Sequence, residues 1–401
     1  MQGRVAVMDD LSEELRFAIA ASCDTGPDLP GSNFDWVKLH RLAVRHRIEG
    51  VVGAAVSALP AEYVPAETRA QVDVDRRSLA LMYLGQLAET LRISKFLERA
   101  GIPCIALKGC IFAKSHYDPH PEQRHAVDID ILVAPSDFAE ADRCLKKEGY
   151  VRSCPNFEPP ASSEEMVHFL LNAYEYRHST NGLHVELHHR LLFNPYILPV
   201  PFHELLTNSE EIKIADGRVR GLTGNLLAAY LCAHSAGHAF FRLKWVADTH
   251  RLFSAMAVAE CRDLLVRASN WRCKKPIYLA LFLEETLTGS VQVLLDDERR
   301  RILKPLLKHC LRELFKVETN EVHGLRDLPD DFRRMVYGMR LTDDVRARAF
   351  PVLRSLIHPD DARLLKLDTK WMVLYALMGR PLAASRLVKR TLRPNGDNLI
   401  G

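Results

Sequence analysis

Two aspartates separated by one hydrophobic residue carry most of the chemistry that this sequence can support. Asp128 and Asp130 lie in the run 127–133, where acidic and aliphatic residues alternate as they do in a β-strand. Because side chains alternate between the two faces of a strand, we expect both carboxylates on one face and the aliphatic neighbours on the other. Two adjacent carboxylates repel each other unless a cation lies between them, so the pair predicts a site for Mg²⁺ or Mn²⁺.

The alternative for the same pair is an exposed strand edge with two solvated acids. If the pair is a catalytic metal site, we expect the removal of Asp128 or Asp130 to abolish catalysis, because it removes a ligand of the metal ion. Removing one charge from a repelling pair is at the same time expected to change stability little or to increase it.

A lysine, a glycine and an arginine upstream of this strand have the chemistry of a phosphate site. The apolar run 102–107 predicts a strand that leads into Lys108, Gly109 and Cys110. Glycine at a strand end allows a tight turn in which backbone N–H groups approach a phosphate closely. Arg124 precedes the first aspartate, and its forked guanidinium suits phosphate oxygens. A Lys-Gly pair is also typical of ordinary turns, and we expect Cys110 to be a small turn residue rather than a nucleophile.

A third carboxylate is expected on a neighbouring strand. Asn181 and Gly182 separate two alternating segments, which predicts a β-hairpin whose second strand covers 184–188. On that strand Glu186 and His188 share one face. A third acid beside the aspartates would complete a two-ion site and help to hold the ion that activates an attacking hydroxyl. We expect His188 to position that acid or the substrate.

The combination of these motifs resembles the nucleotidyltransferase superfamily that includes DNA polymerase β. Its members share a glycine turn after a first strand, an Asp-hydrophobic-Asp strand and a third acid on a later strand. Within it, the chain is most similar to an uncharacterised bacterial family of nucleotidyltransferase-like proteins. That family has a Leu-Lys-Gly turn, an arginine shortly before Asp-Ile-Asp, and a Glu/Asp-x-His strand, all of which stand in this sequence. The likeness covers roughly residues 30 to 360 and is most specific over 107–188.

The resemblance implies a role for each matching residue. The catalytic residues and metal ligands would be Asp128, Asp130 and Glu186. The residues that bind the nucleotide would be Lys108, Gly109, Cys110, Arg124 and Lys244. The chain departs from the superfamily at Cys110, where serine or glycine is usual, and in the spacing of 128 − 109 = 19 residues between the glycine turn and the first aspartate. These departures bear on the pose of the nucleotide more than on the metal site.

Two histidines four residues apart predict a second functional element on a helix. His234 and His238 would share one helix face, and together with His188 they are candidates for the acceptor side of the site. Such a pair can bind zinc, but the sequence between them lacks the glutamate of a zinc protease. The simpler alternative is a pair of hydrogen-bonded histidines at an interdomain surface. Lys244 follows on the next helix, where a plain ion pair with Asp248 is the alternative to a phosphate contact.

Composition narrows the class of protein. The 401 residues are 47% hydrophobic and 26% charged, as in ordinary globular proteins. A net charge of +3 gives no strong signal for nucleic acid. Nine cysteines without a C-x-x-C pair predict reduced thiols in a cytoplasm. We see no signal peptide, and the longest apolar run, 371–378, is too short to span a membrane.

The pattern of elements predicts an α+β fold, in which a small mixed sheet forms a nucleotidyltransferase core between two helical regions. We expect an N-terminal helical region at 1–100, including a long helix over 65–100, and the α/β core at 101–222. A helical domain at 223–318 and a C-terminal extension at 319–401 with a basic tail follow. A second hairpin is expected at Asp216 and Gly217.

The function we predict is metal-dependent transfer of a nucleoside monophosphate from a nucleoside triphosphate, with ATP as the default, to an unknown hydroxyl acceptor. A small molecule, a protein side chain and an RNA end are the open acceptor classes. One alternative is a nucleotide-sensing or toxin–antitoxin-type binding module with little turnover. The other is a metal-dependent phosphohydrolase that uses the same carboxylates together with the histidines.

Overall fold

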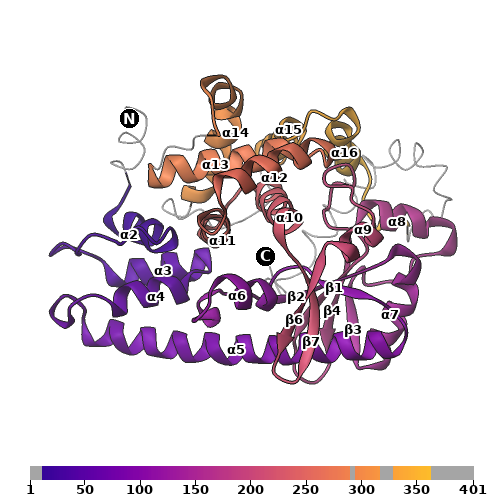
Figure 1. Cartoon of the computed structure of the whole chain (residues 1–401), viewed down its shortest axis with the longest axis horizontal. Helices are drawn as coiled ribbons and strands as arrows, with labels where there is room; N and C mark the ends of the chain where they lie inside the picture. Colours follow the sequence, from indigo (N-terminus) through magenta and orange to yellow (C-terminus); the bar gives the residue numbers. More distant parts are fainter. Residues whose placement is uncertain (1–10, 290–293, 317–327, 363–401) are drawn as a thin grey trace.

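The computed structural model describes residues 11–289, 294–316 and 328–362, and it has the predicted α+β architecture (Figure 1). The first helices are α2 (Glu13–Ser22), α3 (Trp36–His46), α4 (Glu49–Ser57), η1 (Ala61–Tyr63) and α5 (Ala66–Arg99). The core contains β1 (Cys104–Ala106), α6 (Cys110–His116), η2 (Pro121–Gln123), β2 (Asp128–Val133), η3 (Pro135–Asp137), α7 (Phe138–Lys147), β3 (Tyr150–Cys154), η4 (Ala161–Ser163), α8 (Glu164–Leu170), β4 (Ala173–His178), β5 (His184–His188), α9 (Phe202–Thr207), β6 (Ser209–Ile214) and β7 (Gly217–Leu222). The last helices are α10 (Gly224–Gly237), α11 (Leu243–Ser254), α12 (Val258–Asn270), α13 (Lys274–Thr288), α14 (Asp297–Phe315), α15 (Leu328–Arg340) and α16 (Val345–Leu356).

In the described part of the chain, a mixed sheet of seven strands carries the motifs discussed above, in the order β3-β4-β5-β2-β1-β7-β6. Strand β2, which bears the two aspartates, lies in the middle of this order. It pairs antiparallel with β1 and parallel with β5. Both predicted hairpins are confirmed, since β4 pairs antiparallel with β5 and β6 with β7.

The alternation along β2 gives the sheet two different faces. Ile129 and Ile131 are buried in a core between the sheet and helices α5, α7 and α8. Asp128 and Asp130 lie on the opposite face together with Leu132, which packs in the larger core of the helices before and after the sheet. The acidic face is therefore turned toward the helical half of the protein.

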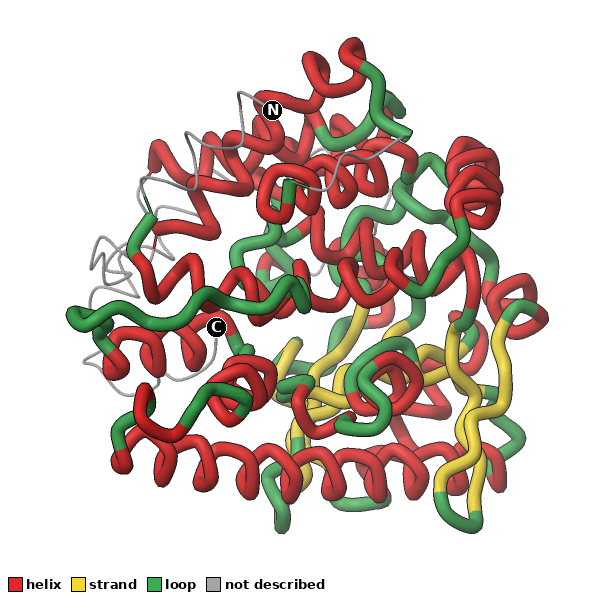
Figure 2. The backbone as a smooth tube through the Cα atoms, turned by 60° about the vertical axis from the view of Figure 1, so that its left-hand side comes forward, coloured by secondary structure: helices red, strands yellow, loops and turns green. Residues whose placement is uncertain are grey.

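Helix α5 confirms the predicted long helix and joins the N-terminal helices to the sheet. It has 34 residues and runs along one side of the N-terminal helices and of the sheet (Figures 1 and 2). It packs against α4, β1, β7 and α7. Near its C-terminal end Ile93 and Leu97 are fully buried in the core of the sheet. Helices α10 to α14 lie across the sheet from it (Figure 1).

The described residues bear on the predictions about membrane spans and cysteines. Within the described residues, no helix combines the length and the apolar character needed to cross a bilayer. All nine cysteines are free thiols. The apolar run 371–378 and the basic tail lie outside the described residues, and the boundaries after residues 100, 222 and 318 stay predictions.

Candidate active site

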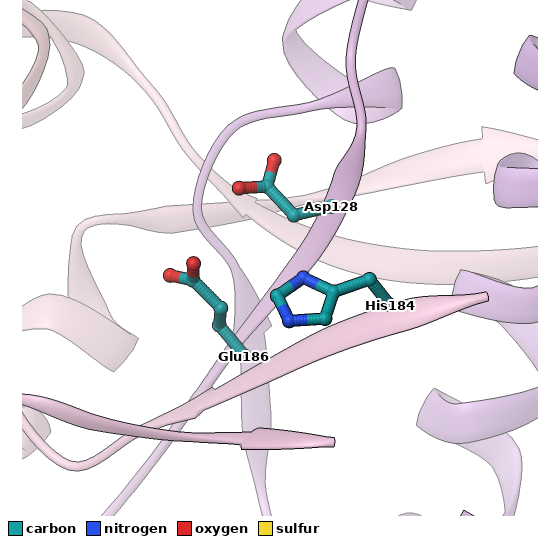
Figure 3. Close-up of side chains that lie close together, drawn as sticks. All are labelled: Asp128, His184 and Glu186. Carbon is teal, nitrogen blue, oxygen red and sulfur yellow. The ribbon is translucent and has the colours of Figure 1, made fainter. Parts of the chain in front are cut away.

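The parallel pairing of β2 with β5 brings the predicted acids together. Asp130 lies opposite Glu186 in the ladder, and Asp128 lies opposite His184. Because both strands alternate with the same period, these side chains extend to one side of the sheet. Figure 3 shows three of them, Asp128, His184 and Glu186, close together. Asp130 is 2% exposed, whereas the other three residues are partly exposed. The sheet thus presents one buried and two accessible carboxylates at a single place.

Two overlapping groups of side chains could hold a metal ion. One consists of Asp128, His184 and Glu186, and the other of Asp130, Glu186 and His188, with the ligand atoms of each group within 4.8 Å of one another. Glu186 belongs to both groups. Carboxylate oxygens suit Mg²⁺, and the imidazoles make Mn²⁺ equally acceptable. The donor set therefore fits a divalent cation.

His184 is a candidate ligand that the sequence analysis missed. Its signal was present, because His184, Glu186 and His188 alternate with aliphatic residues and so share one strand face. Its partner on the next strand is Glu175, whose Oε2 lies 3.7 Å from His184 Nε2. Hydrogen bonding to Glu175 raises the pKa of His184 above its ordinary value.

Two cations of the protein itself lie among the acids. Lys108 Nζ donates to both carboxylate oxygens of Asp130 at 2.6 Å and lies 3.8 Å from Oδ2 of Asp128. His188 Nε2 lies 3.1 Å from Oδ1 of Asp130 and 3.1 Å from Oε2 of Glu186. The Lys108 and Asp130 side chains are 10% and 0% exposed, so water screens their attraction little.

These contacts control which groups are charged. Burial would raise the pKa of Asp130, but the charge of Lys108 and the hydrogen bond from His188 hold it well below its usual range. Burial would lower the pKa of Lys108, yet Asp128 and Asp130 raise it well above its ordinary value. Burial would likewise lower the pKa of His188, but hydrogen bonds to Asp130 and Glu186 raise it to about 9. Near neutral pH, Asp130 is thus ionised and both cations are protonated.

The Gly109 turn joins β1 to α6 directly beside the aspartates. Gly109 has a φ of +66°, where residues with side chains are rare, and a Cβ added to it would lie 3.3 Å from the carbonyl oxygen of Asp128. Cys110 is buried, with Sγ 3.3 Å from Oγ1 of Thr90. Burial raises the pKa of the Cys110 thiol to about 11, so the thiol is a poor nucleophile at neutral pH.

Arg124, for which a phosphate contact is predicted, has a structural role inside the fold. Its Nε and Nη2 donate to the two carboxylate oxygens of Asp248 at 2.9 and 2.8 Å, and Nη1 donates to the Gly109 carbonyl at 3.0 Å. The side chain of Arg124 is 3% exposed. Three of the five N–H groups of Arg124 bond inside the fold, so Arg124 holds the glycine turn against α11. The phosphate contact predicted for Arg124 stays a prediction.

Three cations from two distant parts of the chain lie on the helical side of the site. Arg47 follows the last residue of α3, while Arg242 and Lys244 lie at the start of α11. The positive charge of each interacts with Asp128. Arg47 and Arg242 could not be found from the sequence, because nothing local connects residues so far apart. An anion placed beside Asp128 would lie near these three positively charged side chains.

Lys244 is the most unusual of these cations. It is buried, and no acid in the described part of the chain forms an ion pair with its ammonium. Burial and then the positive charge of Arg124 lower the pKa of Lys244 to about 7. The alternative of an ion pair with Asp248 is wrong, since that carboxylate accepts hydrogen bonds from Arg124 and from Tyr117 Oη.

The two predicted helix histidines form part of an aromatic group at the end of α10. The ring centroids of His234 and His238 lie 4.7 Å apart. The exposed His238 stacks on Trp245 at 5.0 Å with an interplanar angle of 18°, and Phe241 contacts Trp245 edge-on at 4.8 Å. Among the described residues, neither histidine belongs to a group of candidate metal ligands. This arrangement favours a stacking surface over a zinc site.

Comparison with known protein families gives a match over the region of the site. A sequence model of the family described as "uncharacterised nucleotidyltransferase" matches residues 32–289, which is more than half of the chain. The matched region contains both strands that carry the acids, the glycine turn and helices α10 and α11. No curated protein and no solved structure matches the chain.

Proposed function

Since the chain belongs to this family of nucleotidyltransferases and is therefore an enzyme of nucleotidyl transfer, we propose that it moves a nucleoside monophosphate from a nucleoside triphosphate to a hydroxyl acceptor with the help of Mg²⁺ or Mn²⁺. The observation that carries the proposal is the convergence of Asp128, Asp130 and Glu186 on one face of two paired strands. ATP is the proposed donor. The order of glycine turn, Asp-x-Asp strand and third-acid strand also supports placement in the DNA polymerase β-like superfamily.

The three carboxylates are proposed to hold the ions, and the two histidines are proposed to join them as ligands after each releases its proton to solvent. Asp128, Glu186 and His184 form one ligand group, and Asp130 joins Glu186 and His188 in the other. When bound, such ions neutralise charge on the phosphates and lower the pKa of an attacking hydroxyl. The protein supplies their position, because the ladder between β2 and β5 fixes the spacing of the acids.

The remaining residues are proposed to bind the triphosphate. The turn at Gly109 offers backbone N–H groups beside the aspartates, and Lys244 and Arg47 offer positive charge across from them. The acceptor oxygen forms a bond to the α-phosphorus while the bond from that phosphorus to the bridging oxygen breaks, which releases pyrophosphate. The hydroxyl proton leaves to solvent. His238 and Trp245 are proposed to lie on the acceptor side.

The test is product analysis with the full chain. Purified protein is incubated with MgCl₂ or MnCl₂ and each of the four ribonucleoside triphosphates labelled at the α-phosphate, with and without small-molecule, protein and RNA fractions of a lysate. Label joined to one fraction, with release of pyrophosphate that depends on this fraction, supports the proposal. Asp130→Asn, which removes one ligand, serves as the inactive control.

The two rival functions give different outcomes in the same assay. A phosphohydrolase releases inorganic phosphate from the nucleotide in the absence of any acceptor. A binding module releases neither product, although Mg²⁺ and nucleotide together raise its melting temperature more than either alone. The nine free cysteines support a reducing, cytoplasmic setting for the reaction.

A further inference from the structure

The position of Lys108 within the acidic site is unexpected for a residue assigned to phosphate. Its Nζ lies 2.6 Å from each carboxylate oxygen of Asp130 and 3.8 Å from Oδ2 of Asp128. The ammonium therefore stands where the two carboxylates of β2 converge. Both partners are almost fully enclosed, so the pair belongs to the interior of the site and not to its solvated edge.

This position is incompatible with a divalent ion held by the same oxygens. Mg²⁺ binds its oxygen ligands at about 2.0–2.1 Å. An ammonium nitrogen 2.6 Å from those oxygens would then lie almost in contact with the ion. Two positive charges at such a separation repel strongly where water is excluded. A metal ion held by both oxygens of Asp130 must therefore take the place of the ammonium.

We propose that Lys108 is an exchangeable cation, which neutralises Asp130 in the metal-free enzyme and is displaced by the metal ion toward the phosphates of the nucleotide. The proposal rests on the proposed nucleotidyl transfer and adds to it an order of events. Lys108 immediately precedes Gly109, so a small movement of its side chain carries the ammonium from the acid to the phosphate turn. The carboxylate of Asp130 thus has a positive partner in both states, which is the ammonium in the metal-free enzyme and the metal ion in the loaded enzyme.

The exchange couples metal binding to nucleotide binding. While the ammonium is on Asp130, it competes with the metal and is withheld from the phosphates. Once the metal has displaced it, the ammonium is available as a phosphate donor, and a bound phosphate then holds it away from the acid. Metal and nucleotide should therefore strengthen each other's binding by more than their direct contact with one another explains.

The test measures metal binding without turnover. Mn²⁺ is titrated by calorimetry into the full-length wild type, Lys108→Met and the control Lys147→Met, which removes an exposed lysine at the end of α7. We expect Lys108→Met to bind Mn²⁺ at least about 10-fold more tightly than the wild type, and Lys147→Met to match the wild type. Equal or weaker binding of Mn²⁺ by Lys108→Met overturns the exchange.

A second measurement on the wild type covers the case in which Lys108→Met fails to fold. Lysines are acetylated with a short pulse of reagent, and the labelled peptides are quantified by mass spectrometry. Addition of Mn²⁺ alone should increase labelling of Lys108 several-fold and leave that of Lys147 unchanged. Unchanged or reduced labelling of Lys108 while Mn²⁺ binds overturns the exchange and leaves the proposed transfer intact. Absence of Mn²⁺ binding in both the wild type and Lys108→Met instead overturns the metal dependence on which both proposals rest.

Discussion

Arg124 and Asp248 form a buried ion pair with two hydrogen bonds, of 2.9 and 2.8 Å, between the loop before β2 and helix α11. Their side chains are 3% and 1% exposed. The pair joins the sheet to the helical half of the protein across 124 residues of sequence. Lys244 lies one helical turn before Asp248, so the same pair fixes the helix that places this lysine near Asp128.

We predict that Asp248→Asn lowers stability strongly. Removing one partner leaves the guanidinium of Arg124 buried without its charge partner, which costs about 3–5 kcal/mol. Urea unfolding measures the loss. Asp73→Asn is the matched control, since Asp73 pairs with Arg76 on an exposed helix surface, where such pairs contribute under about 1 kcal/mol. Similar losses in both variants would mean that the buried pair does not join the two parts.

We predict that Asp130→Asn lowers the rate of nucleotide transfer by at least about 100-fold, as expected for a group that helps to neutralise transition-state charge. The structure also reverses the stability effect expected from two repelling aspartates. Asp130 is bonded to Lys108 and His188, so its neutralisation leaves two cations facing an amide. The free energy of unfolding should therefore fall. Transfer near the wild-type rate would contradict the assignment of Asp130 as a metal ligand.

We predict that Lys244→Met makes the protein more stable at neutral pH, by on the order of 1–3 kcal/mol, because it removes a buried cation without an acid partner. The pKa of Lys244 is about 7 in the folded protein and about 10.4 in the unfolded chain. Between these values only the unfolded chain holds the proton, so the stability of the wild type rises relative to Lys244→Met as the pH increases through this window.

Urea unfolding of both proteins near pH 7 and near pH 9 checks this prediction. The stability advantage of Lys244→Met should shrink at the higher pH. The control Lys274→Met, at an exposed position on α13, should show no such change. An advantage that is constant with pH would show that the lysine keeps an ordinary pKa.

We predict that His238→Ala separates acceptor handling from nucleotide handling. The exposed ring of His238 stacks on Trp245 outside both groups of candidate metal ligands. Its loss should lower transfer to the acceptor by roughly 10- to 100-fold through lost positioning and leave the affinity for a non-hydrolysable nucleotide nearly unchanged. Calorimetry and the transfer assay provide the two readouts. Loss of nucleotide affinity would instead place this surface on the nucleotide side.

Local patterns in the sequence were sufficient to predict the strand that carries the aspartates, both hairpins and the long helix α5. They also predicted which side chains share a face, since alternation along a strand is a property of the backbone alone. Alternation therefore places Asp128 with Asp130 on one face, and Glu186 with His188 on one face, whatever the pairing of the strands.

Only the tertiary structure decided how these pieces meet. The parallel register that sets Asp130 opposite Glu186, the choice of Asp248 as the partner of Arg124, and the contact of Lys108 with Asp130 all join residues that lie far apart in the sequence. Such contacts depend on how the helices pack against the sheet, and the same charged side chain has several possible partners until burial removes water as one of them. For this reason the sequence alone determined the acidic face of the strand, whereas the fold determined which cations neutralise it.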